Sequence, residues 1–126
     1  MLTDCLATAM LPVVDMNRAR RFYEETLGLT PGRARPNGET RYQAGGTSFA
    51  LYQRPTPTRA DHTALSFEVK DIAAEMAALR ARGVRFEDYD MPGLKTSNGV
   101  CELGAERAAW FRDPEGNILC LHQDKH

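Results

Sequence analysis

The sequence has no long apolar run and no excess of charge of either sign. No segment approaches the roughly 18 apolar residues that a membrane-spanning helix needs. Sixteen basic residues stand against seventeen acidic ones, which leaves a formal net charge of −1. A nucleic-acid or membrane-surface protein needs a concentrated basic face, so this balance argues against both partners. The N-terminal MLTDCLATAM has no Lys or Arg before its apolar stretch, so no signal peptide is expected.

Cysteine is scarce as well. The three cysteines, Cys5, Cys101 and Cys120, are odd in number and lack the spacing of a metal-binding pair. Reduced thiols in a cytoplasmic protein are therefore expected, not a disulfide framework. Apolar and charged residues are present in ordinary proportions, 42% and 26% of 126 residues. This composition suits one compact domain spanning residues 1–126.

The strongest pattern in the chain is an internal repeat. Segments 13–29 and 69–84 each begin with strand-like residues and an aspartate, continue for about three helical turns and end at a glycine. The aspartates suit a helix N-cap and the glycines suit the left-handed position after a helix. These residues are Asp15 and Gly28 in the first segment, and Asp71 and Gly83 in the second.

Strand-like sequence follows each predicted helix. The predicted strands are 41–44 and 48–53 in the first half, and 84–89, 108–112 and 118–123 in the second. Gly45-Gly46 predicts a hairpin turn, and a second turn is expected at 113–117. Residues 46–53 align with 116–123 without a gap, so each half is predicted to be β-α-β-β-β. The halves cover 5–53 and 62–124, and residues 54–61 link them.

Two motifs resemble those of a known family. Residues 22–29, FYEETLGL, are similar to its FYxxxLG helix end, and residues 110–117, WFRDPEGN, to its aromatic-x-DPxGN turn. Both occur in order, within a repeat that covers nearly the whole chain. The family is the glyoxalase/bleomycin resistance/dioxygenase, or vicinal-oxygen-chelate, superfamily. The resemblance implies an α+β fold with two βαβββ modules forming a curved mixed sheet around an open cavity, and a homodimer.

Strand alternation predicts which side chains face away from the helices and toward a ligand. Residues 90–107 have little periodicity, and they are expected to form a loop that is partly a lid and partly a dimer contact. Aromatic groups with a few polar points suit a flat small molecule, although such a face can also pack on a second sheet or subunit. The predicted ligand-binding residues are Met10, Arg41, Tyr52, His62, Ser66, Met91, Trp110, Cys120 and His122.

The resemblance also locates the family's metal ligands, at Thr8, Ala50, Ala64 and Cys120. None of the four supplies a carboxylate or an imidazole, whereas a catalytic divalent site usually needs about three such ligands. No metal and no cofactor are therefore expected. His62 and His122 are expected to lie over about 10 Å apart, too far to share a metal. His126 ends the chain and is expected to be disordered.

Three functions stay open at this point. The first is a metal-free small-molecule binding protein that sequesters an antibiotic or a toxic aromatic compound. The second is a glyoxalase- or dioxygenase-like lyase, isomerase or oxygenase that uses a metal or a His/Cys acid–base group. The third is an interaction module whose cavity is filled by dimerisation. No catalytic residue is assigned.

Overall fold

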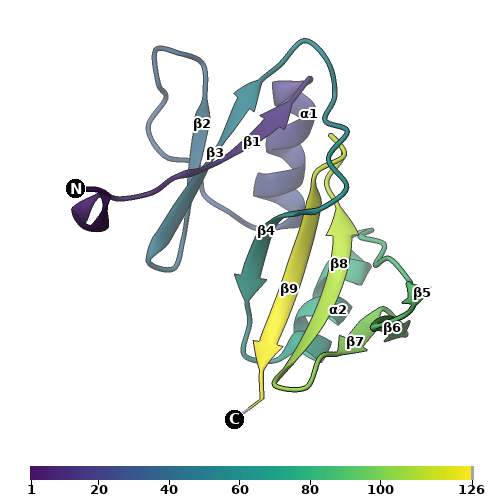
Figure 1. Ribbon diagram of the computed structural model, residues 1–126. Coiled ribbons are helices and arrows are strands. Elements are labelled where there is room, and N and C mark those ends of the chain that lie inside the picture. The colour runs from purple at the N-terminus through teal and green to yellow at the C-terminus, as the bar shows by residue number, and fades with distance from the viewer. Residues whose placement is uncertain (126) are drawn as a thin grey trace. The chain divides into compact units, whose positions relative to one another are not determined.

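A computed structural model describes residues 1–125, so the expectation for His126 lies outside the described residues. The chain divides into two compact units (Figure 1). Unit 1 is Met1–Thr58 and unit 2 begins at Arg59. Each unit contains one sheet and one main helix.

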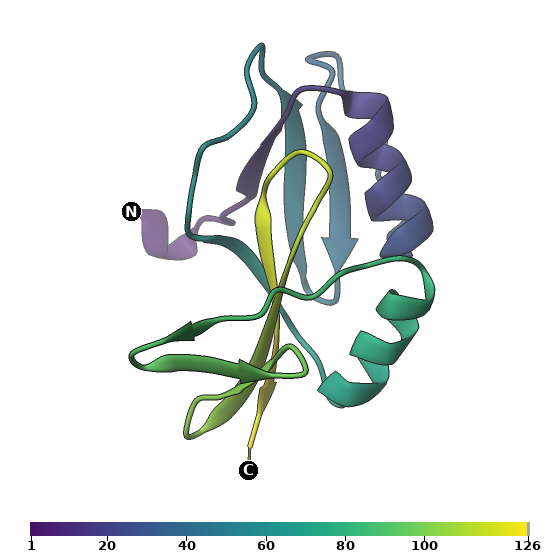
Figure 2. The same cartoon turned by 90° about the vertical axis from the view of Figure 1, so that its right-hand side faces the viewer.

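Unit 1 is a three-stranded mixed sheet with a helix along one face (Figure 2). The strand order is β1-β3-β2, in which β3 pairs parallel to β1 and antiparallel to β2. The elements are η1 (Leu2–Asp4), β1 (Ala9–Val13), α1 (Met16–Arg21), η2 (Phe22–Thr26), β2 (Thr40–Ala44) and β3 (Thr47–Gln53).

The helix of unit 1 begins and ends as its sequence predicts. Asp15 caps α1, because its Oδ1 accepts a hydrogen bond of 3.0 Å from the Arg18 backbone N–H. The helix then widens into the π-helical turn η2, and Gly28 follows with a φ of 76°. Its buried face packs on an aromatic cluster in which the Tyr23 ring lies 5.8 Å from Tyr42 and 5.7 Å from Phe49.

A buried phenol links the sheet of unit 1 to its helix. The Tyr42 hydroxyl donates to Glu24 Oε2 at 2.8 Å, and Arg20 Nε donates to the same oxygen at 2.7 Å. Burial, followed by the hydrogen bond to Glu24, raises the pKa of Tyr42. The hydrogen bond from Arg20 lowers the pKa of Glu24. These contacts fix which face of β2 is turned to the helix.

Unit 2 is a six-stranded mixed sheet in the order β4-β9-β8-β7-β6-β5. Strand β4 is parallel to β9, and the other pairs are antiparallel. Helix α2 lies behind β8 and β9 in Figure 1. The elements are β4 (Thr63–Glu68), α2 (Ile72–Ala81), β5 (Asp90–Met91), β6 (Leu94–Ser97), β7 (Val100–Glu102), β8 (Glu106–Arg112) and β9 (Ile118–Asp124).

The N-terminus of α2 in unit 2 is also fixed by capping hydrogen bonds. Asp71 Oδ1 accepts from the Ala74 N–H at 3.1 Å, and Gln123 Oε1 on β9 accepts from the Ile72 N–H at 2.8 Å. The second bond places Gln123 on the helix side of the sheet. The buried core on this side comprises Ile72, Met76, Leu79, Phe111, Leu119 and Leu121.

The turn from β8 to β9 is held by a buried carboxylate. Asp113 Oδ1 accepts from the backbone N–H groups of Glu115 and Asn117, at 2.9 and 2.8 Å. Its Oδ2 accepts from Asn117 Nδ2 at 2.9 Å. Gly116 has a φ of 93°, which a residue with a Cβ adopts only under strain. The DPEGN sequence is therefore a self-contained turn, which explains why it can be found from sequence alone.

The α+β fold class is confirmed: among residues 1–125, two α-helices accompany two mixed sheets, neither of which closes on itself. Strand details differ from the prediction. The expected strand 84–89 is reduced to a single bridge, Phe86 to Phe111, and the corresponding strand of unit 1 is reduced to a bridge from Pro31 to Tyr42. Within the described residues, each of these segments makes too few ladder bonds to count as a strand.

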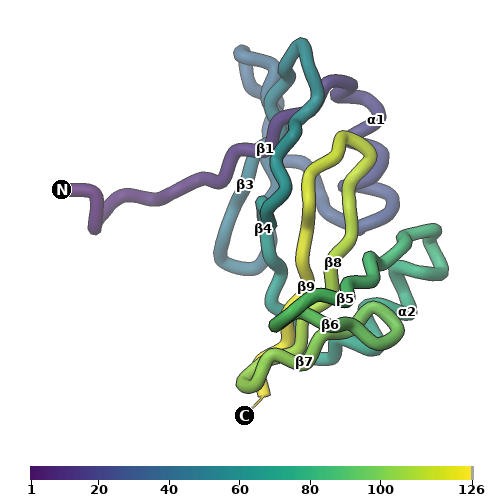
Figure 3. Tube along the Cα trace, turned by 45° about the vertical axis from the view of Figure 1, so that its right-hand side comes forward, coloured from purple at the N-terminus to yellow at the C-terminus, as the bar shows by residue number. Residues whose placement is uncertain are grey.

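The predicted loop at 90–107 is wrong. This segment forms three short antiparallel strands, β5, β6 and β7, which extend the sheet beyond β8 (Figure 3). Weak alternation and turns with positive φ at Asn98 and Gly99 hid these strands from a periodicity search. Among residues 1–125, no helix has the length and apolar content needed to cross a membrane.

Candidate functional site

The open face of unit 2 is the face of its sheet turned away from α2. Gln123 bonds to the helix, so alternation places Cys120 and His122 on the other side of β9. Cross-strand pairing then aligns Ser66, Cys120 and Trp110 in one row from β4 to β8. Glu68, His122 and Ala108 form the next row. Four of the predicted ligand-binding residues are thus brought together in unit 2.

A β-bulge changes the start of β4. The register shifts between Thr63 and Leu65, so alternation counted from Ser66 back to His62 does not hold. Thr63 takes the open-face position, and its Oγ1 accepts a hydrogen bond of 3.1 Å from Trp110 Nε1. His62 precedes the strand, and its Nδ1 lies 3.3 Å from the carbonyl oxygen of Thr63. The sequence around Thr63 does not signal a bulge, so strand alternation cannot predict this shift in register.

Ser66 connects two functional groups on the open face of unit 2. Its Oγ lies 2.6 Å from His122 Nδ1, and its hydroxyl also hydrogen-bonds to the Cys120 thiol. Burial raises the pKa of Cys120, and the bond from Ser66 offsets this only in part. The thiol therefore stays protonated near neutral pH, which is unfavourable for a nucleophile. Ser66 and His122 can therefore hydrogen-bond to a ligand, whereas Cys120 offers it a small apolar surface.

Trp110 is partly exposed and is held from two sides. Thr63 accepts its indole N–H, and the ring of Tyr89 meets it edge-on, with centroids 5.7 Å apart and planes at 77°. Burial, followed by the nearby Glu87, raises the pKa of Tyr89. Tyr89 is absent from the predicted ligand-binding residues because it lies beyond the isolated Phe86 bridge. No strand pairing continues there, so strand alternation does not predict which way its side chain points. An indole locked in this way offers a rigid apolar surface for a flat ligand.

Metal donors meet at the end of this face. The donor atoms of Glu68, His122 and Asp124 all lie within 4.8 Å of one another. One imidazole and two carboxylates are ligands that divalent cations accept. His122 Nδ1 is engaged by Ser66, which leaves Nε2 as its donor. Sequence reasoning missed this group because it tested the family positions and paired His122 only with His62.

The four positions that the family resemblance assigns to metal ligands carry poor donors. Ala50 is fully buried and Ala64 sits at the bulge of β4, and neither has a donor atom. Thr8 precedes β1 and carries only a hydroxyl. Cys120 is a buried thiol with a raised pKa. Three strong ligands cannot be assembled from these four residues.

The open face of unit 1 is defined in the same way. Tyr42 bonds to the helix, so Arg41 lies on the other side of β2. Pairing aligns Met10, Ala50 and Arg41 in one row, and Pro12 with Tyr52 in the next. Met10 is 44% exposed. The predicted residues Met10, Arg41 and Tyr52 therefore share this face.

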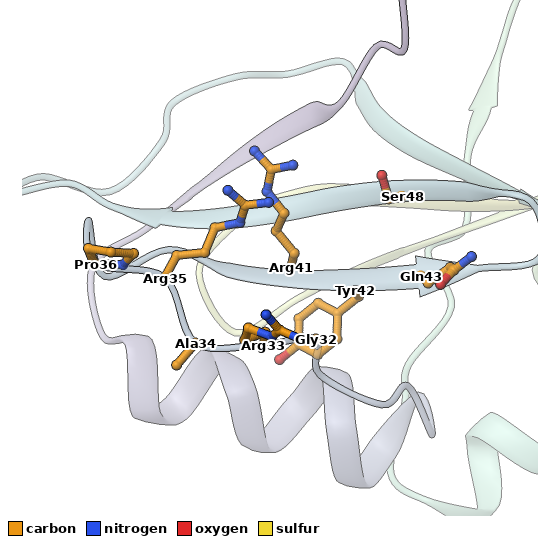
Figure 4. A pocket seen from close by; sticks show the side chains of 9 residues that line it. All are labelled: Gly32, Arg33, Ala34, Arg35, Pro36, Arg41, Tyr42, Gln43 and Ser48. Carbon is orange, nitrogen blue, oxygen red and sulfur yellow. The ribbon is translucent and has the colours of Figure 1, made fainter.

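A cavity of about 440 Å³ opens beside β2 of unit 1 (Figure 4). The segment 32–36 forms one wall, and β2 with the start of β3 forms the other. Gly32 ties this segment to β2, because its N–H donates to the Arg41 carbonyl at 2.8 Å. The lining residues are Gly32, Arg33, Ala34, Arg35, Pro36, Arg41, Tyr42, Gln43 and Ser48. Of these, the sequence predicted only Arg41.

Met91 stands apart from the other predicted residues. It lies on β5, at the opposite end of the strand order from β4 and β9, and is 49% exposed. It is therefore not part of the row formed by Ser66, Cys120 and Trp110. The correction of residues 90–107 from loop to strands accounts for this position.

Comparison with known proteins gives one family. The model of the Glyoxalase/Bleomycin resistance protein/Dioxygenase superfamily matches residues 6–121. A search of curated proteins finds no significant match.

Solved structures of the same fold cover nearly the whole chain. A superfamily member from Sphaerobacter thermophilus is 26% identical over 98% of this chain and 100% of its own, with a TM-score of 0.73. TnmS3, an antibiotic binding protein from Streptomyces sp. CB03234, is 26% identical over 97% of this chain and 98% of its own, with a TM-score of 0.69. FosX, a fosfomycin resistance protein from Listeria monocytogenes, shares the fold at 15% identity over 95% and 93%, with a TM-score of 0.71.

Proposed function

Because the chain belongs to the Glyoxalase/Bleomycin resistance protein/Dioxygenase superfamily, we propose that it binds a flat organic molecule, such as an antibiotic or a toxic aromatic compound, and sequesters it unchanged. The binding surface is the open face of unit 2. The ligand stacks on Trp110 and hydrogen-bonds to Ser66 or His122. The cytoplasm is the proposed location.

One observation carries this proposal: an aromatic ring and polar groups are already held in one rigid row. Trp110 is fixed by Thr63 and Tyr89, and Ser66 is fixed by His122 and Cys120. Side chains held in place before binding lose little conformational entropy when a ligand arrives. The antibiotic binding protein TnmS3, at 26% identity over nearly the whole chain, supports the same function. The poor donors at the family's metal positions fit binding without bond chemistry.

Trp110 is the only tryptophan, so its fluorescence reports directly on this face. Titration with a panel of aromatic and antibiotic-like compounds is expected to quench or shift its emission, and to raise the unfolding temperature. A ligand at a hundredfold excess over its Kd adds about 2.7 kcal/mol of stability. The unfolding temperature is the readout for variants, because Trp110→Ala removes the only tryptophan. Trp110→Ala should weaken binding about tenfold, since stacking contributes about 0.5–1.5 kcal/mol beyond the burial of apolar area. Met91→Ala, an exposed apolar control in the same unit, should not.

A second candidate function follows from Glu68, His122 and Asp124, whose donor atoms lie within 4.8 Å of one another. A divalent cation held by this group would favour a metal-dependent lyase or oxygenase. Calorimetry of metal-stripped protein with Mn²⁺, Ni²⁺ or Zn²⁺ separates the two functions. Stoichiometric binding that His122→Ala abolishes favours the enzyme. Absence of cation binding, together with ligand binding at Trp110, favours sequestration.

A homodimer is also part of the proposal. The family resemblance predicts one, and Met10 and Met91 each leave an apolar side chain at least 44% exposed. Sedimentation equilibrium of the purified protein measures the mass directly. A species of 28 kDa, twice the chain mass of 14.0 kDa, is expected. A monomer at all concentrations would remove this part of the proposal.

A further inference from the structure

The cavity of unit 1 is unusual in its charge. Arg33, Arg35 and Arg41 line it, and no acidic residue among those that the structure describes does. The carboxylate that contacts two of these arginines is that of Glu39, whose side chain is only 7% exposed. Its Oε1 lies 2.7 Å from Arg41 Nε and 3.6 Å from Arg35 Nε. Three guanidinium groups and one carboxylate leave a local charge of about +2.

Glu39 orients the arginines and leaves their outer nitrogens available. Both ion pairs use Nε, so among the described residues the Nη atoms of Arg35 and Arg41 keep no protein acceptor. The hydrogen bond from Arg41 lowers the pKa of Glu39, so this carboxylate is charged at neutral pH. In Figure 4 the guanidinium groups of Arg35 and Arg41 point to the same side of the sheet. This geometry allows the two guanidinium groups to donate hydrogen bonds to one shared acceptor.

We infer that this cavity binds the oxyanion of a small organic ligand, meaning a carboxylate, a phosphate or a phosphonate. Arg35 and Arg41 supply the charge-assisted hydrogen bonds, and Gln43 and Ser48 add neutral ones. A volume of about 440 Å³ is within the range of small-molecule sites. The inference goes beyond the proposed function, because it concerns a separate cavity, in unit 1, and a ligand that carries negative charge.

Isothermal titration calorimetry at low salt tests the inference with four probes: inorganic phosphate, phenylphosphonate, benzoate and the neutral benzamide. The three anions are expected to bind, and benzamide at least about tenfold more weakly, since it cannot make a charge-assisted pair. Raising the salt concentration should weaken the anions and leave benzamide unchanged, because exposed charges are screened.

Variants distinguish anion binding in the cavity from nonspecific attraction to positive charge elsewhere on the protein. Arg41→Ala should weaken anion binding about 10- to 100-fold, and Arg41→Lys should fall between, because it keeps the charge and loses the fork. Glu39→Gln should strengthen binding about three- to tenfold, because the amide oxygen can still accept the hydrogen bond from Arg41 while the competing negative charge is lost. Arg85→Ala is the matched control: Arg85 is an exposed arginine of unit 2, outside the cavity, and its loss should change nothing.

The Glu39→Gln variant keeps the test decisive if Arg41→Ala fails to fold. Equal binding of benzoate and benzamide, or anion binding that Glu39→Gln leaves unchanged, overturns the inference. The outcome is independent of the proposed function. Trp110 quenching without anion binding would leave that function standing and refute this inference. Anion binding that depends on Arg41, without any compound reaching Trp110, would do the reverse.

Discussion

The two units carry different chemistry at matching positions of one scaffold. Across unit 1 the row on the open face is Met10, Ala50 and Arg41, and across unit 2 it is Ser66, Cys120 and Trp110. Met10 and Ser66 each lie five residues before the capping aspartate of their helix. The helix side repeats as apolar core in both units, while the open side changes from cationic to aromatic and polar.

This difference separates the roles of the two faces. The helix side must be buried for either unit to fold, so its side chains are restricted to apolar types of suitable size. On the open side, the partly exposed positions such as Arg41 and Trp110 carry no such restriction. In unit 1 it gathers arginines beside a cavity, and in unit 2 it gathers Glu68, His122 and Asp124 at one end. Repeat symmetry therefore predicts the scaffold and not the ligand.

Thiol reactivity should show the largest contrast between the units. Cys5 of unit 1 is exposed, whereas Cys101 and Cys120 of unit 2 are buried, and burial also raises the pKa of Cys120. Ellman's reagent is expected to modify one thiol of the native protein at once, and the other two about 100-fold more slowly or only on unfolding. A second fast thiol that disappears in Cys120→Ala would return Cys120 to the candidate nucleophiles.

The second-largest effect is expected at the hairpin turns of the two units, which should contribute differently to the free energy of unfolding. Asp113→Ala removes three hydrogen bonds and leaves buried donors without an acceptor, so the free energy of unfolding should fall by about 3 kcal/mol in a urea titration. In unit 1, Gly45→Ala should cost only about 1 kcal/mol, because its φ of 56° is strained for alanine but its Cβ meets open space. Similar costs for both variants would contradict the idea that the two turns are held differently.

The matching core positions Tyr42 and Phe111 allow a smaller test. Tyr42→Phe gives unit 1 the side chain that unit 2 already has, and removes only the hydroxyl bonded to Glu24. A loss of about 1 kcal/mol is expected from urea unfolding, since a typical buried hydrogen bond is worth about that much. Glu24→Gln combined with Tyr42→Phe should cost less than the sum of the single changes. Strict additivity would mean that the hydroxyl and the carboxylate do not interact.

The smallest effect should be the pH dependence of the Arg20–Glu24 pair. The pKa of Glu24 is lowered in the folded protein, so its contribution is present above the unfolded pKa and is lost as the pH falls through the folded pKa. Glu24→Gln should cost about 0.5 kcal/mol at neutral pH, as an i,i+4 pair does, and nothing in acid. Unfolding curves at a series of pH values measure this. A cost that persists in acid would assign the effect to packing.

Much of the fold could be predicted because its signals are local. The caps at Asp15 and Asp71, the turn at 113–117 and the strands 41–44, 48–53, 108–112 and 118–123 all depend on residues close together in the chain. The strands between 90 and 102 escaped because each has at most four residues, too few to show a period.

The candidate sites were predictable only in part. Alternation along regular strands correctly placed Arg41, Trp110 and His122 on the open faces. It failed at the start of β4. Alternation predicted that His62 and Ala64 would lie on the open face, but the bulge places Thr63 there instead. Tyr89, Arg35 and Glu39 lie in irregular segments, for which the sequence has no period to follow.

The sequence by itself determined the repeat, the capped helices, the tight turn and the sidedness of the long strands, because each follows from contacts over a few residues. Tertiary structure alone decided which side chains meet: Ser66 with His122, Glu68 with Asp124, and Arg35 with Arg41 through Glu39. The first two of these pairs depend on the register between strands that are far apart in the chain. The third depends on a loop folding back along β2. Local sequence encodes neither, because both are set by the packing of the whole unit.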